Sequence, residues 1–170
     1  MASILKTDKI EGVTASGTVA MPSGSIVQVV QREVANSFFS TTNNATYTDV
    51  TNFYIDITPK FSDSIIIWET TLIGNVNNSA THADFRVVNS NDSDAVIHTG
   101  TSTATFGYYN TMTTNYAETP IRAVDANCGT TSTMRLQLQT SLGNNTGGNT
   151  FTINWSSNTI KTITAIEIKA

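Results

Sequence analysis

The chain is dominated by short segments in which apolar and polar residues alternate, the pattern of strands with one buried face. The longest such segment is 63–76, where an isoleucine run, Trp68 and Leu72 supply apolar residues to both faces. Residues 131–141 alternate as cleanly, with Met134, Leu136 and Leu138 against Arg and Gln. We predict further strands in 25–31, 52–59, 83–89, 95–100, 103–110, 114–126, 149–156 and 161–170.

The alternation also predicts which side chains enter the core. In 63–76, Ile66, Trp68, Thr70 and Leu72 share one face, and Ile65, Ile67, Glu69, Thr71 and Ile73 share the other. The same reasoning groups Phe53 with Ile55 and Ile57, and Phe151 with Ile153 and Trp155. In the last segment it selects Ile163, Ala165 and either Ile166 or Ile168. We expect both tryptophans to be largely buried.

Turn-forming residues separate these segments at regular intervals. Asn, Ser and Gly favour turns, while Thr and the aromatic residues favour pleated strands. No helix of useful length is visible in the pattern. Eight to ten short strands with regular turns are typical of an antiparallel sandwich or barrel. We therefore predict an all-β fold, an antiparallel β-sandwich that is jelly-roll-like, with an extended N-terminal arm.

Residues 1–24 differ from the rest because they form a thin, extended ribbon punctuated by Gly and by Pro22. A ribbon of this kind cannot bury its own apolar residues. We expect these residues to contact another surface: Ile4, Leu5, Ile10, Val13 and Val19. The predicted organisation is an arm over 1–24, used for assembly or attachment, and a sandwich domain over 25–170.

Charge is scarce, at 13% of residues against the usual ~25%. The net charge is −4 and no window holds a Lys/Arg cluster, which argues against nucleic acid and anionic membranes as partners. No stretch approaches a membrane span, and no signal-peptide core opens the chain. We expect synthesis in a cytoplasm, without export by the general secretory route. The single cysteine, Cys128, is expected to be a small turn or core residue.

No pattern for nucleotide, zinc or hydrolase chemistry is present, so we expect no enzyme activity, cofactor or metal. The run NSNDSD at 89–94 could offer oxygens to Ca²⁺, but it lacks the Gly and Glu of an EF-hand loop and is better interpreted as a turn. His82, Asp84 and Glu69 could join an acid–base site, although a solvated loop end is the favoured interpretation of His82 and Asp84.

Tyrosines offer one further binding surface. Tyr108, Tyr109 and Tyr116 flank a predicted turn and could contact a glycan or receptor. Alternating core and rim tyrosines explain them equally well.

Three stretches resemble a group of tailed-phage virion proteins common in marine and cyanobacterial phages. They are SILKTDKIEG followed by GTVAMPSGSIVQVVQ, then YIDITPKFSDSIIIWETTLIGNV, and finally NTIKTITAIEIKA. The resemblance implies a fibre, spike or capsid-decorating protein, often trimeric, with a β-sandwich head. It carries no catalytic motif, and residues from about 80 to 150 contribute nothing to it.

Together these features predict a non-enzymatic structural protein of a phage particle, located in the virion. We expect a homotrimeric capsid-decoration (cement) or short fibre protein, attached through its arm to capsid or tail proteins. The alternative is a carbohydrate-binding, lectin-like β-sandwich module such as the receptor-binding head of a tail fibre. A concave aromatic face or a metal site on the sandwich would favour that alternative.

Overall fold

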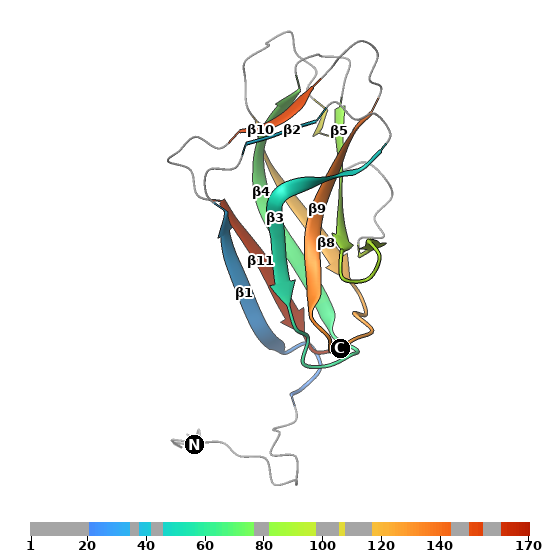
Figure 1. Cartoon of the computed structure of the whole chain (residues 1–170). Coiled ribbons are helices and arrows are strands. Elements are labelled where there is room, and N and C mark those ends of the chain that lie inside the picture. Colours follow the sequence, from blue (N-terminus) through green and yellow to red (C-terminus); the bar gives the residue numbers. More distant parts are fainter. Residues whose placement is uncertain are drawn as a thin grey trace, which may run out of the picture.

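The computed structural model describes residues 21–34, 38–41, 46–76, 82–97, 106–107, 117–143, 150–154 and 161–170. Within these ranges the chain contains strands and turns and no helix. The strands form two antiparallel sheets that face each other (Figure 1). The predicted all-β sandwich is confirmed.

In the first sheet, four long strands lie in the order β1, β11, β4, β8. Their bounds are β1 (Ile26–Val34), β11 (Lys161–Ile168), β4 (Ile65–Val76) and β8 (Ala117–Asp125). Strand β11 pairs with the first half of β4, and the C-terminal end of β4 pairs with β10 (Phe151–Asn154). Strand β10 in turn pairs with β2 (Phe38–Thr41). The long strand β4 thus spans the whole sheet and organises it.

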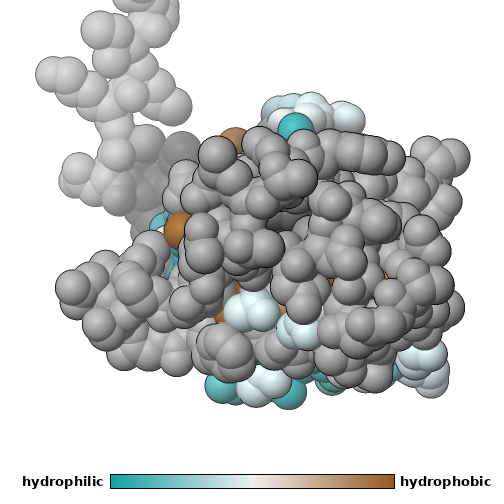
Figure 2. Space-filling view, turned by 90° about the horizontal axis from the view of Figure 1, so that it is seen from above, coloured by the Kyte–Doolittle hydropathy of each residue, from teal (hydrophilic) through white to brown (hydrophobic). Residues whose placement is uncertain are grey.

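The second sheet has the order β3, β9, β5, with two short strands along the outer edge of β5. Its bounds are β3 (Thr48–Ile57), β9 (Met134–Gly143), β5 (His82–Asn89), β6 (Ala95–Val96) and β7 (Phe106–Gly107). Strands β6 and β7 pair with opposite ends of β5. Seen from above (Figure 2), the visible described residues are mostly polar, and apolar ones show only in small areas.

The strand order makes the sandwich a jelly roll. Strands β1, β4, β8 and β11 lie in one sheet, while β3, β5, β6 and β9 lie in the other, so the chain repeatedly crosses between sheets. Such long crossings, which place the last strand beside the first, are typical of two interlocked Greek keys. The predicted jelly-roll-like class is confirmed, and only the short strand β2 was not predicted.

The core lies between the sheets and is aliphatic and aromatic. Trp68 is fully buried, and its ring meets Phe53 edge-on at 6.3 Å between centroids. Phe151 is also fully buried and makes a similar contact with Phe85 at 5.4 Å. The predicted inward faces of β3, β4, β9 and β10 are confirmed, while Trp155 lies outside the described residues.

The inward face of β11 differs from the prediction at one position. Ile163 and Ala165 are buried as expected, but the third inward residue is Glu167, which has no exposed surface. Ile166 and Ile168 lie on the opposite, outer face and are only half-buried. The strict two-residue period of a strand therefore overrides the preference of isoleucine for the interior.

Candidate assembly site at the root of the N-terminal arm

The chain enters the sandwich next to its own C-terminal residues (Figure 1). The N–H of Gly24 donates to the carbonyl of Lys169 (2.8 Å), and the N–H of Lys169 donates to the carbonyl of Ser25 (2.9 Å). Gly24 has φ +84°, a conformation that side-chain-bearing residues rarely adopt. Residues 21–24 themselves are exposed, so this end of the predicted arm is held at its base and open to its surroundings.

The carboxylate of Glu167 binds three segments together at this root. It accepts hydrogen bonds from Gln28 Nε2 (2.6 Å) and Ser64 Oγ (2.7 Å). The backbone N–H groups of Lys60 (2.8 Å) and Phe61 (3.2 Å) donate to Oε1, the oxygen that also accepts from Ser64, while Gln28 donates to Oε2. Glu167 therefore holds the start of β1 against β11 and against the connection between β3 and β4.

The ionisation of Glu167 follows from these contacts. Burial raises its pKa, but hydrogen bonds from Ser64, from Gln28 and from the backbone of Lys60 and Phe61 outweigh the burial, so the pKa lies below its usual value. The carboxylate is thus charged and saturated with donors. No described catalytic partner approaches it, and its role is to hold the root in place.

The connection that carries Lys60 and Ser64 is held from its other side as well. The N–H of Cys128 donates to the carbonyl of Ser64 (2.9 Å), and its Sγ lies 3.4 Å from the carbonyl oxygen of Phe61. Cys128 is half-buried and packs against the core, as expected for a small turn residue. Lys169 Nζ pairs with Asp63 and lies over the Phe61 ring, which adds a contact at the surface.

The residues predicted to make assembly contacts lie outside the described part of the chain. These are Ile4, Leu5, Ile10, Val13 and Val19. Tyr108, Tyr109 and Tyr116, predicted as possible glycan or receptor contacts, are outside it too. Both assignments, and the division into 1–24 and 25–170, stay predictions.

The acid–base grouping of His82, Asp84 and Glu69 is not assembled. Asp84 lies inside the paired strand β5 and is half-buried, so its predicted position at a solvated loop end is wrong, while His82 is the first residue of that strand. Glu69 is exposed on the outer face of the other sheet. Asp84 and Glu69 lie on different sheets and face away from the core, so they cannot act on one reacting group.

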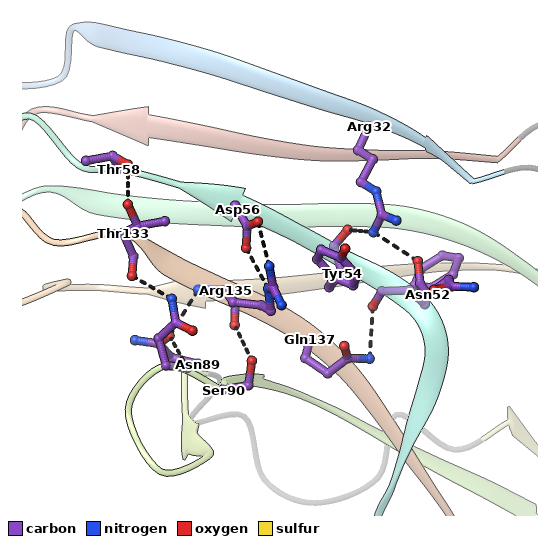
Figure 3. A network of polar contacts seen from close by, with 12 residues as sticks. Arg32, Asn52, Tyr54, Asp56, Thr58, Asn89, Ser90, Thr133, Arg135 and Gln137 are labelled. Atoms are coloured by element: carbon purple, nitrogen blue, oxygen red, sulfur yellow. Dashed lines mark hydrogen bonds and ion pairs between the residues drawn. The ribbon is translucent and has the colours of Figure 1, made fainter.

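The run at 89–94 is a turn, as predicted. Asn89 Oδ1 accepts hydrogen bonds from the N–H groups of Asn91 (3.2 Å) and Arg135 (3.1 Å), and Asn91 Nδ2 donates to the carbonyl of Thr133 (Figure 3). Ser93 and Asp94 adopt positive φ, which Asp tolerates in turns. The described residues contain no group of three or more His, Cys, Asp or Glu that could hold a metal ion.

The ring of Tyr54, which lies on the described surface, is covered by the side chains of Arg32 and Arg135 (Figure 3). The guanidinium carbons of Arg32 and Arg135 lie 3.8 and 4.3 Å from its centroid, too close for both to share one face of the ring. Arg135 also forms a bidentate salt bridge with Asp56, which raises the pKa of Arg135. Because sugars stack on free ring faces, Tyr54 offers them no platform.

Sequence reasoning missed Glu167 and Gln28 as members of the root. One signal was available, because Glu167 occupies the third inward position of the series that begins with Ile163 and Ala165. A charged residue at an inward position implies that other buried groups form hydrogen bonds or an ion pair with it. Nothing in the sequence indicates that Gln28 and Ser64 supply those groups, since both pairings are far apart along the chain.

No protein-family profile matches the chain, and no curated protein matches it. Among solved structures, the VP2 subviral particle of infectious bursal disease virus is similar, with a TM-score of 0.44 and 12% identity over 95% of this chain and 42% of that one. The T13 viral particle of infectious bursal disease virus gives 0.45 and 12%, over 95% and 40%. The chain thus spans less than half of either protein. At these values the likeness assigns neither family nor function.

No helix capable of spanning a membrane occurs in the described ranges.

Proposed function

We propose that this chain is a non-enzymatic structural protein of a tailed-phage particle, attached through residues 1–24. In this role it is a homotrimeric capsid-decoration or short fibre protein whose partners are its own copies and the capsid or tail proteins beneath. Its place of work is the virion, after synthesis in the host cytoplasm. The trimer is favoured because capsid threefold sites and fibres both require it.

The observation that carries this proposal is the construction of the arm root. The described strands of the sandwich enclose a large apolar core. Glu167, together with the hydrogen bonds that join Gly24 and Ser25 to Lys169, fixes where the predicted arm begins. Such a rigidly held base supports the proposal that the segment before it attaches the subunit.

Deletion of residues 1–20 tests the proposal, because it removes the five predicted contact residues and keeps the Gly24–Lys169 hydrogen bonds. A fully buried aliphatic side chain contributes about 1.5–3 kcal/mol, an upper figure because ordering the arm opposes it. Half of that across five residues still spans several decades in affinity. We expect steep loss of occupancy when the truncated protein is added to particles that lack the chain.

A matched control replaces the five residues by serine in the full-length chain, which keeps the length and removes the apolar surface. We expect it to fail in the same way. Occupancy equal to that of the unmodified chain, for either variant, would show that the sandwich alone makes the attachment and would refute the proposed role of the arm.

A further inference from the structure

The outer faces of the two sheets have opposite character. On the outer face of β3, β9 and β5, polar side chains bond to one another, as in the Arg86–Gln139–Asp49 chain of hydrogen bonds (2.7 and 2.8 Å). Gln137, in the middle of this face, donates to the carbonyls of Val50 and Phe53. An antiparallel sheet that faces water is expected to look like this.

The outer face of β1, β11, β4 and β8 is aliphatic instead in the part nearest the arm root. Strand register places one residue from each strand side by side in a single row: Val29, Ile166, Ile67 and Val124. A second row, nearer the arm root, contains Ile26, Ile168 and Ile65. We call these seven residues the aliphatic patch.

The patch is open at the β1 edge, where Ile26 is 60% and Val29 52% exposed. Its other members are half-buried, since neighbouring side chains on a sheet cover one another. The next row contains Gln31, Thr164, Glu69 and Arg122, so an apolar centre is bordered by polar groups of both signs. That arrangement is typical of a protein–protein interface.

We infer that the aliphatic patch is the surface through which copies of this chain contact one another. This inference rests on the proposed structural role. Glu69 and Arg122, directly opposite on β4 and β8 and both exposed, can be met by Gln31 and Thr164 of a neighbouring copy, because an amide and a hydroxyl group each donate and accept hydrogen bonds. A partner whose surface carried charge of one sign only would repel either Glu69 or Arg122.

The size of the face agrees with this occupant. With strands ~4.8 Å apart and rows ~7 Å apart, the three rows cover on the order of 400 Å². The exposed residues Met21–Gly24 and the adjoining edge of β1 extend it toward the ~800 Å² per partner of a stable interface. In a closed ring, the β1–β11 half would meet one neighbour and the β4–β8 half the other.

The test compares two valines of similar exposure on different sheets. Val29→Asp places a carboxylate in the patch, and Val96→Asp places one on β6 of the other sheet, where Val96 is 46% exposed. We expect the unmodified full-length chain and Val96→Asp to sediment as trimers of the 18.3 kDa chain. We expect Val29→Asp to associate at least ~100-fold more weakly, because its carboxylate would be desolvated in an apolar contact.

Val29→Thr is the control for misfolding of Val29→Asp, because threonine keeps the shape and the strand preference of valine. It should still weaken association measurably.

The inference is overturned if the unmodified chain is monomeric at tens of micromolar. It is also overturned if both Val29 variants associate normally, or if Val96→Asp dissociates the oligomer as strongly. A full-length monomer that associates once residues 1–20 are removed would show that the chain's own arm covers the patch. Particle attachment through residues 1–20, measured separately, can succeed or fail independently of all these outcomes.

Discussion

Glu167 shows how one buried charge can organise a region of the molecule. Its partners come from the start of β1 and from the connection between β3 and β4, more than 100 residues away in sequence. Without this carboxylate, the N–H groups of Lys60 and Phe61 and the hydroxyl of Ser64 would each lose an acceptor at the base of the sandwich. A carboxylate at this inward position is therefore structural, and it has consequences for the response to acid.

Folding stability should fall at low pH through Glu167. Because its folded pKa is lowered from 4.5, the unfolded chain binds the proton more readily. Its contribution is complete above pH ~4.5, the ordinary value, and disappears as the pH falls through the folded pKa. Urea unfolding of the unmodified chain at pH 7 and pH 3 measures the loss.

Glu167→Gln should remove much of this acid dependence and cost about 2–4 kcal/mol at pH 7, because an NH2 group replaces one carboxylate oxygen and cannot accept from its donor, and the remaining hydrogen bonds lose the negative charge. Asp63→Asn is the control, since Asp63 makes only a surface pair with Lys169 and should change stability little. An acid dependence unchanged in Glu167→Gln would assign it to other carboxylates.

At the scale of elements, Gly74 is the point where β4 meets β10. A Cβ built on Gly74 would lie 2.8 Å from Cε2 of Phe151 and 3.1 Å from the carbonyl oxygen of Thr152. The missing side chain lets the buried Phe151 ring lie directly on the strand. Gly74→Ala should therefore cost about 1–3 kcal/mol through overpacking, measured by urea unfolding.

A double-mutant cycle identifies the cause of that cost. In a Phe151→Leu background the added methyl group meets a smaller side chain, so Gly74→Ala should cost clearly less than in the unmodified protein. Equal costs in both backgrounds would show that the Phe151 ring is not what Gly74 accommodates.

The elements that sequence predicts well are those with a one-sided pattern. In β3 and β9 the inward residues are apolar and the outward ones polar, so period alone identifies the core, as with Phe53 and Leu136. In β11 both faces carry isoleucine, and the choice between Ile166 and Ile168 misses Glu167. The short β2 has too few residues for a period, and the pairing of Gln28 with Glu167 depends on contacts that sequence spacing does not encode.

At the scale of the whole molecule, the sandwich should remain folded without its arm. The buried core of the described residues is drawn from β1, β3–β5, β8–β11 and nearby turns, strands that supply their own apolar faces to one another. Deleting residues 1–20 should therefore shift the melting temperature of an isolated subunit by no more than a few degrees, as followed by circular dichroism. A large drop would mean that the arm completes the core.

The placement of the arm root also determines where a pull on the predicted arm would act. The described chain enters β1 at the strand's lower end, after a turn in which the N–H of Ser25 donates to the carbonyl of Pro22 (3.1 Å) (Figure 1). A pull along β1 from that end acts on the ladder that joins β1 to β11 from Ile26 to Val34. Antiparallel hydrogen bonds run perpendicular to the strands, so the whole ladder is loaded together in shear and is not opened one bond at a time. If residues 1–24 tether the subunit to a particle, as proposed, loading this ladder in shear makes the subunit harder to tear away than peeling the strand would.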